Sequence, residues 1–501
     1  MNTTYRIRFL ITLLPAVLLL AAGRKDMPFS SSELEAHLRY LASDELMGRD
    51  TGTAGNDSAA AYIARHFERY GLQKAPGLDT WFQPVPLERV APDKEGRVVV
   101  ADDTLLFSRE VILRNGTAGE IVSEFVFAGH GWVDTTAGID DYAGLDVRGK
   151  IVVVAYGTPA KQNAYSGMMA GRMKRSFARA HGAAALVELY EGRFPWRNLY
   201  RWMAGERLRL RQDDSGQPSD MIHLLIDNSE GKVKKRLESL DEAKMAISTS
   251  GQNLSPVSSN NVIGYLPGSD ARRADEFIVL SAHYDHVGVK SSHGDASADT
   301  IYNGARDNGI GTVALLAAAK ALAADPPPRP VLFIAFTAEE KGLLGSRYFV
   351  EQSPVALHNL RYVLNNDGAG YTDTSEISLI GLGRTTADSA IINGCRSAGL
   401  AVGDDPTPDK SLFNRSDNVN FARKGIPAVT FSPGVKAFDA EIMKYYHKPS
   451  DEVTDDFDFD YLLRYARAYV KSARLIAAMP GTPFWTAGDP YEKAGEELYG
   501  Q

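Results

Sequence analysis

Histidine and acidic residues follow three apolar runs in the second half of this 501-residue chain. They are His283-Tyr284-Asp285 after the run at 277–282, Glu339-Glu340 shortly after 331–336, and Asp367 shortly after 362–364. Short apolar runs of this kind are typical of buried strands. Because ligands of open α/β sheets bind at the carboxyl ends of the strands, we expect these side chains to meet at one sheet edge.

Two further residues complete the candidate set. Asp307 lies in the loop 303–308 before a long apolar helix, and His447 lies in the loop 445–449 after the last strand. Carboxylates that converge without a cation would repel one another and raise one another's pKa values. Histidine together with Asp and Glu is a ligand set that suits zinc better than calcium or magnesium.

The number of ligands indicates how many metal ions the site would hold. The five candidates are His283, Asp307, Glu340, Asp367 and His447. They are too many for one tetrahedral zinc that keeps an open position, and they suit two metal ions bridged by one carboxylate. We therefore predict two zinc ions per chain.

An α/β fold must position these residues. Apolar strand candidates recur at 262–266, 277–282, 331–336, 362–364, 377–382 and 429–431, and a helical segment spans 309–324. Continuous apolar strands indicate a sheet that is buried on both faces. Their alternation with helices predicts a mixed, largely parallel central sheet flanked by helices.

The chain divides into further parts on the basis of its pattern. A capped helical stretch from Ser30 is interrupted by the loop 48–53 and ends near Gly71, and from Trp81 the pattern changes to short strands without a cluster of metal ligands. We expect a helical part of the catalytic domain at 30–90, an inserted module at 91–252, the catalytic domain at 253–480, and a polar, peripheral tail at 481–501.

Within the inserted module, residues 193–211 are rich in arginine and aromatic residues. A basic and aromatic stripe could bind a polyanion. The interpretation that we favour is a loop or amphipathic helix that packs on the neighbouring domain, since such side chains cover apolar surface with their stems.

The N-terminus predicts export. Arg6 and Arg8 precede the apolar run 9–20, and the small residues 21–23 follow it, as in a secretory signal peptide at 1–23. The run is short for a membrane span, so we expect a periplasmic or secreted protein with no stable span after cleavage; retention of the segment as an anchor is the alternative. The net charge of −8 argues against nucleic acid as a main partner.

The order of these motifs resembles that of the M28 zinc aminopeptidases. The resemblance lies in 283–285, 307–308, 338–346, 366–367 and 446–447, while 127–131, 141–145 and 148–150 resemble the protease-associated (PA) domain found inserted in many members. The resemblance implies a zinc-exopeptidase-like fold with an inserted β-rich PA-like domain, through which a protein contact is possible. It also implies peptide substrates with a free N-terminus.

The resemblance further assigns roles to single residues. One zinc would be bound by His283 and Asp367, the other by Glu340 and His447, with Asp307 as the bridge. Glu339 would be the general base, and Asp285 would hydrogen-bond the far nitrogen of His283. Tyr446 would donate to the oxyanion, and Arg415 and Asp417 would bind substrate, although Asn418 stands where the family often has His. His286 lies outside the matched motifs, and we assign it no role.

Several alternatives stay open at this point. A carboxypeptidase on the same fold would need a cation for a terminal carboxylate, for which Arg415 is a candidate, and a glutaminyl cyclase would be expected to use one zinc. A non-catalytic, receptor-like homologue should lack ligands, whereas all five are present here. The inserted module could also be the main functional element, as a protein-binding domain.

Overall fold

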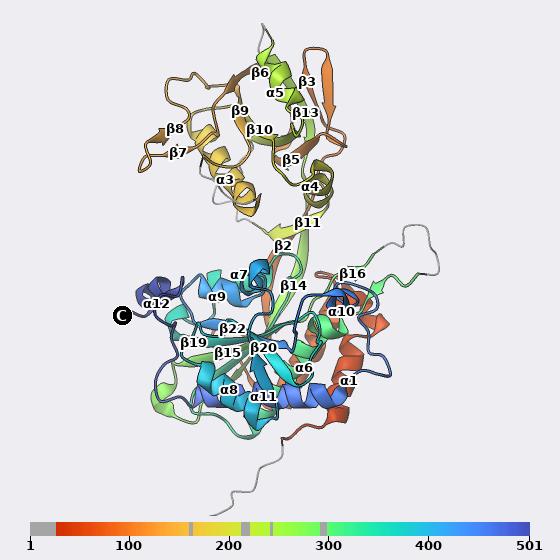
Figure 1. Ribbon diagram of the computed structural model, residues 1–501, viewed down its shortest axis with the longest axis vertical. Coiled ribbons are helices and arrows are strands. Elements are labelled where there is room, and N and C mark those ends of the chain that lie inside the picture. Colours follow the sequence, from red (N-terminus) through yellow and green to blue (C-terminus); the bar gives the residue numbers. More distant parts are fainter. Residues whose placement is uncertain (1–26, 160–163, 212–220, 241–243, 291–297, 501) are drawn as a thin grey trace, which may run out of the picture.

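The computed structural model describes residues 27–159, 164–211, 221–240, 244–290 and 298–500, which form two lobes joined by a narrow neck (Figure 1). The signal peptide expected at 1–23 lies outside these residues. Among the helices of the described ranges, none has the length and apolar character needed to cross a membrane.

The larger lobe is built on a ten-stranded mixed sheet. Its strands, in spatial order, are β11 (Arg207–Leu210), β2 (Phe82–Ala91), β14 (Asn253–Leu266), β18 (Val331–Phe336), β15 (Phe277–His283), β19 (Leu360–Asn366), β22 (Ala428–Pro433), β20 (Glu376–Ile380) and β21 (Ala401–Gly403), with β1 (Gln73–Lys74) beside β14. The four central strands β18, β15, β19 and β22 run parallel, and antiparallel pairs flank them on both sides. The mixed α/β sheet predicted from the sequence is confirmed.

Helices cover both faces of this sheet because successive strand residues point to opposite sides. In β15, Ile278 and Leu280 pack with one helical layer, and Phe277 and Val279 pack with the other. The first layer contains α1 (Ser31–Leu41), α2 (Ala54–Arg69), α6 (Ile310–Ala324), α8 (Asp388–Ser397) and α11 (Phe459–Ala477); the second contains α7 (Leu344–Glu351), α9 (Asn418–Ala422) and α12 (Glu492–Tyr499). The sheet is therefore buried on both faces. This packing holds the strands, and so the residues at their ends, in place.

The smaller lobe has its own sheet and core. The strand order is β4 (Asp103–Leu106), β3 (Arg97–Val100), β13 (Lys244–Gly251), β6 (Thr117–Phe127), β9 (Ile151–Ala155), β10 (Ala185–Tyr190), β12 (Ile222–Asp227) and β5 (Val111–Asn115). The helices α3 (Ala164–Ala180), α4 (Trp196–Met203) and α5 (Lys232–Glu238) accompany it. This sheet lies inside the segment 91–252 that the sequence marks as an insertion.

The neck consists mainly of the two long strands β2 and β14, which pair along their whole shared length (Figure 1). One strand from inside the 91–252 segment, β11, pairs with β2 and so joins the sheet of the larger lobe. The chain thus returns to the sheet of the larger lobe in the middle of the segment 91–252. Pattern alone did not place β11 there, because four residues carry too little periodicity.

The C-terminal segment differs from the expected peripheral tail. Trp485 is 2% exposed, and its Nε1 donates to the backbone oxygen of Gly425 at 2.9 Å. It packs with Phe413 and Ala422 in a small apolar cluster. The expectation was wrong for this part of the tail, because one buried tryptophan outweighs the polar composition around it.

Acid sensitivity is expected from a histidine in the helical layer. His37 is buried between the hydroxyls of Tyr62 (Nδ1 to Oη 2.7 Å) and Tyr70 (Nε2 to Oη 3.0 Å). Burial, reinforced by the nearby His66, lowers the pKa of His37 to about 4. Between that value and the ordinary 6.5 the unfolded chain binds the proton more readily, so stability is lost as the pH falls through this window.

We expect the thermal unfolding midpoint of the larger lobe to decrease when the pH is lowered from 7 to 5. The decrease should be smaller in His37→Gln, because glutamine keeps polar contacts to the two tyrosines but does not titrate. Differential scanning calorimetry of both proteins at the two pH values measures this. Equal decreases in the two proteins would contradict the assignment.

Candidate metal centre

The parallel centre of the large sheet brings four candidate residues together, three predicted metal ligands and the expected base. His283 ends β15, Asp367 directly follows β19, and Glu339 and Glu340 follow β18 after a short turn. The turn passes through Ala338 at a positive φ of 56°, which redirects the chain toward the end of the sheet. Because β18, β15 and β19 are neighbours and parallel, their carboxyl ends meet at one edge.

Loops supply the remaining two residues. Asp307 lies in the turn 305–309 that leads into α6, and its backbone N–H donates to Oδ2 of the buried Asp451 at 3.0 Å. His447 lies in the loop after α10 (Ala440–Met443). The structure therefore brings all five predicted metal ligands to one place.

The distances arrange these residues around the Asp307 carboxylate. His283 Nε2 lies 3.4 Å from Asp307 Oδ1 and 3.2 Å from Asp367 Oδ1. His447 Nε2 lies 3.2 Å from Asp307 Oδ2 and 3.1 Å from Glu340 Oε2. Each oxygen of Asp307 thus faces a different histidine. The arrangement is compatible with a carboxylate between two metal ions.

The electrostatics of the cluster favour a cation. Burial alone would lower the pKa of His447, but hydrogen bonds to Asp307 and Glu340 raise it to about 10. The pKa of His283 is likewise raised well above its ordinary value, against the effect of burial, with Asp367 and Glu339 as the main causes. The carboxylates therefore attract positive charge strongly, and a metal ion would take the place of these protons.

The types of the potential ligand atoms and the way they cluster fit zinc. The potential ligand atoms fall into two groups, one of His286, Asp307, Glu340 and His447 and one of His283, Glu339 and Asp367. Glu340 Oε1 is buried and lies 2.8 Å from Nδ1 of His286, so these two side chains of the first group meet. Imidazole nitrogen and carboxylate oxygen are ordinary zinc ligands, so the residues present fit the predicted metal.

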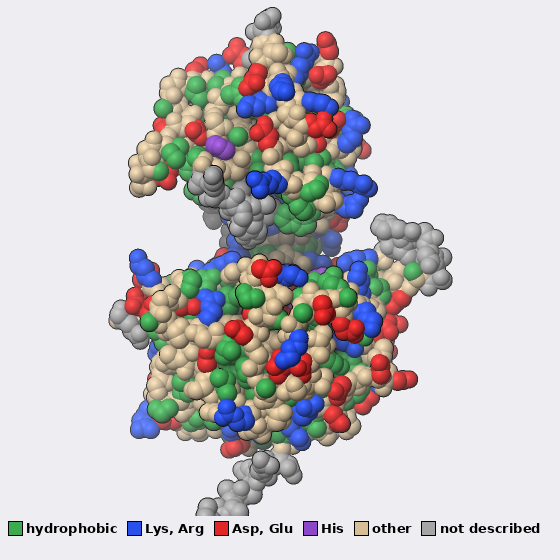
Figure 2. Space-filling model, in the orientation of Figure 1, with side chains coloured by type: hydrophobic (Ala, Val, Ile, Leu, Met, Phe, Trp, Pro, Cys, Tyr) green, Lys and Arg blue, Asp and Glu red, His purple; other side chains and the backbone are tan. Residues whose placement is uncertain are grey.

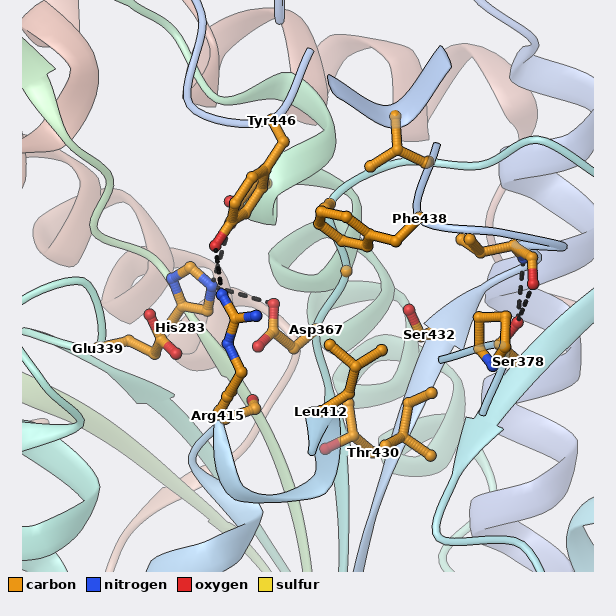
Figure 3. A pocket seen from close by; sticks show the side chains of 18 of the residues that line it. His283, Glu339, Asp367, Ser378, Leu412, Arg415, Thr430, Ser432, Phe438 and Tyr446 are labelled. Carbon is orange, nitrogen blue, oxygen red and sulfur yellow. Dashed lines mark hydrogen bonds and ion pairs between the residues drawn. The ribbon is translucent and has the colours of Figure 1, made fainter. Parts of the chain in front are cut away.

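Glu339 lies beside this cluster. Together with His283, Asp307 and Asp367 it lines a pocket at the edge of the sheet (Figure 3). Burial raises its pKa well above the ordinary value, and the neighbouring Asp367 and Glu340 raise it further. A carboxyl group with a raised pKa can both accept and release a proton near neutral pH. Its placement is compatible with the expected general base.

Asp285 supports the centre differently from the expected role. The hydrogen-bond partner of His283 Nδ1 is the backbone oxygen of Asp285 at 3.1 Å, whereas its carboxylate lies 3.7 Å away. The carboxylate accepts from the backbone N–H groups of Glu339 (3.1 Å) and Glu340 (3.3 Å). Asp285 is fully buried, and it joins the loop after β15 to the loop after β18.

His286 belongs to the cluster, although the sequence motifs left it out. Its Nδ1 lies 2.8 Å from Glu340 Oε1, and the side chain is fully buried. Nε2 has no hydrogen-bond partner in the part of the chain that the structure describes. The signal in the sequence was the pair of histidines three residues apart, at 283 and 286.

The N-terminal segment also contributes to the centre, which the sequence did not indicate. The buried Arg49 guanidinium donates to the backbone oxygens of Tyr284 (Nε, 2.8 Å), Asn303 (Nη1, 2.6 Å) and Gly304 (Nη2, 3.0 Å), and also to that of Leu41. It thereby ties the loop after β15 to the loop that carries Asp307. Only a side chain with several donors in a fixed plane can hold these carbonyls together.

Two neighbours of Arg49 extend this support. The hydroxyl of Thr51 donates to Asp285 Oδ2 at 3.1 Å. Asp50 Oδ1 pairs with Lys341 Nζ at 2.6 Å, next to Glu340. The segment 49–51 therefore contacts three of the loops that carry candidate residues: the loop after β15, the loop before α6 and the loop after β18.

A pocket of about 110 Å³ opens beside the cluster (Figure 3). Arg415 points into it, and its Nη2 donates to the Tyr446 hydroxyl at 3.3 Å. Apolar and hydroxyl-bearing side chains form the rest of the wall, among them Ser378, Ile380, Leu412, Thr430, Ser432, Val435, Phe438 and Ile442.

Asp417, expected to bind substrate, lies behind this wall. It is fully buried and does not line the pocket. Burial raises its pKa to about 7. Direct contact with a substrate is therefore not supported by its position; the neighbouring Arg415 and Ser416 face the pocket instead.

Comparison with known proteins is consistent with this fold. The chain is similar to the aminopeptidase from Aneurinibacillus sp. strain AM-1, with a TM-score of 0.56 and 22% identity, over 90% of this chain and 95% of that one. In sequence it is 28% identical over 198 residues to aminopeptidase YwaD of Bacillus subtilis, which is 39% of this chain and 40% of that protein.

A further relative is a probable leucine aminopeptidase of Arthroderma otae, 27% identical over 217 residues, which is 42% of this chain and 55% of that protein. The chain thus spans about half the length of these curated relatives. The α/β sheet and the ligand candidates that converge at its edge lie in the part of the chain that these relatives share. Residues 261–472 match the model of peptidase family M28.

We expect the contact between Thr51 and Asp285 to matter for metal affinity. Thr51→Val removes the hydroxyl at nearly constant volume and should weaken zinc binding roughly tenfold, as is usual when an outer partner of a metal site is lost. Thr51→Ser keeps the donor and serves as the matched control. Competition with a chromophoric chelator measures the affinities, and equally tight binding by both variants would contradict the role.

Proposed function

We propose that this protein is an aminopeptidase that uses two zinc ions and the carboxylate of Glu339 to remove N-terminal residues from peptides. The observation that carries the proposal is the position of Asp307, whose two oxygens face His283 and His447 separately. His283 and Asp367 would hold one ion, and Glu340 and His447 the other. His286 lies within reach of the second group.

Each residue then has a chemical task. Bound zinc would polarise the scissile carbonyl and lower the pKa of water. Glu339 takes a proton from the attacking water and returns it to the departing amine. The raised pKa of Glu339 supports this exchange of protons. Asp285 holds the backbone of Glu339 and Glu340 in place.

Arg415 and Tyr446 supply polar hydrogens on the open side of the pocket. Their mutual hydrogen bond places both groups near the cluster (Figure 3). Donors held in place before the reaction stabilise a developing oxyanion better than water does, because they need not reorient. We assign this role to Tyr446, with Arg415 as its partner.

The pocket supports a substrate with a free amino terminus and an apolar first side chain. The acidic groups of the cluster attract an ammonium group. The walls formed by Ile380, Leu412 and Phe438 are apolar, and Thr430 and Ser432 add hydroxyls. The names of the similar fungal proteins, probable leucine aminopeptidases, agree with such a substrate.

The proposal extends to the rest of the chain. We infer that the protein is exported through the segment 1–23, and that 30–90 and 253–480 form the peptidase around an inserted PA-like domain at 91–252, which offers a surface for protein contact. The two separate apolar cores support this division.

A carboxypeptidase is the second candidate. The observation that favours it is the cationic Arg415 in the pocket wall, since a guanidinium binds carboxylates well. A cyclase with one zinc ion and a receptor without metal are less consistent with the ligand set, which provides donors for two ions.

Metal content and substrate choice test the proposal together. We expect close to two zinc ions per purified chain, hydrolysis of leucine p-nitroanilide, and no hydrolysis of its N-acetylated form. Removal of the metal by a chelator should abolish the activity, and added zinc should restore it. Hydrolysis that ignores N-acetylation, or that depends on a free C-terminus, would favour the carboxypeptidase instead.

The role of Glu339 makes a separate prediction. Glu339→Gln keeps the size of the side chain but removes the proton acceptor, so kcat should fall by roughly a thousandfold. Zinc content should stay at the wild-type level, as measured by atomic emission. A variant with near-normal kcat would exclude Glu339 as the general base, and a variant without zinc would show that it is needed for binding the metal.

A further inference from the structure

Residues 193–211, here called the arm, carry an unusual local charge. The arm has six arginines and a single acidic residue, whereas the whole chain has a net charge of −8. It consists of α4, a short turn and β11. It therefore runs from the small lobe into the neck.

The first half of the arm lies on the side of the small lobe that faces the large one (Figure 1). Leu199 anchors α4 in a small core with Tyr190 and Leu225. Phe194 and Trp202 remain 46% and 63% exposed. Apolar and basic side chains gather on this underside, where the molecule narrows (Figure 2). Exposed aromatic residues beside arginines are typical of surfaces that bind a partner.

The second half of the arm lies against the catalytic loops. In β11, Leu208 and Leu210 pack with Ala338 and Leu344, and Ala338 precedes the proposed general base Glu339. Because side chains alternate along a strand, Arg207 and Arg209 point to the opposite face of β11. The arm thus connects the aromatic surface of α4 with the neighbourhood of the active site.

Most of the arginines have no acidic partner. Arg209 pairs with Glu88 (Nε to Oε1 2.7 Å), and the one acid of the arm, Glu206, pairs with Arg89. Within the described ranges, no ion pair is formed by Arg193, Arg197, Arg201 or Arg207. Arg207 is exposed on β11. Positive charge therefore accumulates along the arm without compensation.

We propose that the arm binds carboxylate groups in the downstream part of the peptide substrate, beyond the residue that is removed. The proposal rests on the aminopeptidase function. A peptide fits better than a long polyanion, because the acidic remainder of the chain repels extended negative charge. It also fits the position of β11, whose leucines pack against Ala338 and Leu344 on either side of Glu339.

The test compares two matched peptide series. One series has an N-terminal leucine, a glycine spacer and Asp-Asp-amide, and the other has Asn-Asn-amide in the same place. Spacers of roughly one to six glycines vary the distance between the N-terminal leucine and the two acidic residues, since each extended residue adds about 3.5 Å. Leucine p-nitroanilide has no downstream residues and reports the aminopeptidase reaction alone.

In the wild type we expect kcat/KM to be roughly tenfold higher for the acidic series at the best spacer length and low salt. The difference should lie mainly in KM and should decline in about 0.5 M salt, because exposed charges are screened. In Arg201→Gln/Arg207→Gln the ratio should approach one, with the p-nitroanilide rate unchanged. Arg396→Gln on α8 removes an exposed arginine elsewhere and should keep the wild-type ratio.

Three outcomes would overturn the proposal. They are equal kcat/KM values for both series in the wild type, a preference that survives in the double variant, and tight binding to phosphatidylserine vesicles without any peptide preference. If the wild type does not hydrolyse leucine p-nitroanilide, the proposed aminopeptidase function is overturned instead. In that case the affinities of fluorescent peptides from both series, measured by polarisation, still decide whether the arm prefers carboxylates.

Discussion

The mutual repulsion of buried carboxylates is the constraint on which the structure depends. Asp307, Glu340 and Asp367 lie within a few side-chain lengths of one another at the end of the sheet. Such a cluster is stable only if cations or protons neutralise it, which is why the histidines between the carboxylates have raised pKa values. A site that is this costly to assemble needs a rigid support, and the parallel strands at the centre of the sheet provide it.

The support extends beyond the segment that matches the peptidase family. Arg49 and Thr51 lie far upstream of residue 261, yet they contact the loops after β15 and before α6. Their hydrogen bonds are buried, so losing one leaves an unpaired polar group in the interior. The helical N-terminal part is therefore a component of the metal centre, and its removal would disturb the site as well as the fold.

The second lobe adds a surface that a bound peptide could contact beyond the pocket. β2 and β14 form a neck that holds the two lobes together, and β11 returns from the insertion to the catalytic sheet. The basic arm thus reaches from the small lobe to the loop that carries Glu339. Opposite charge on adjacent surfaces gives a bound peptide a direction, because its ammonium end and its acidic residues prefer different places.

The sequence by itself determined the central strands, the long helix 310–324 and the five ligand candidates, because apolar runs and the residues that end them are local features. It did not determine the contacts of Arg49 and Thr51, the position of His286, the burial of Asp417 or the pairing of β11. These depend on segments that are distant in the chain, and single residues carry no pattern that reveals their partners. Only the packed structure decides them, since burial removes water as the alternative hydrogen-bond partner and leaves the side chains to satisfy one another.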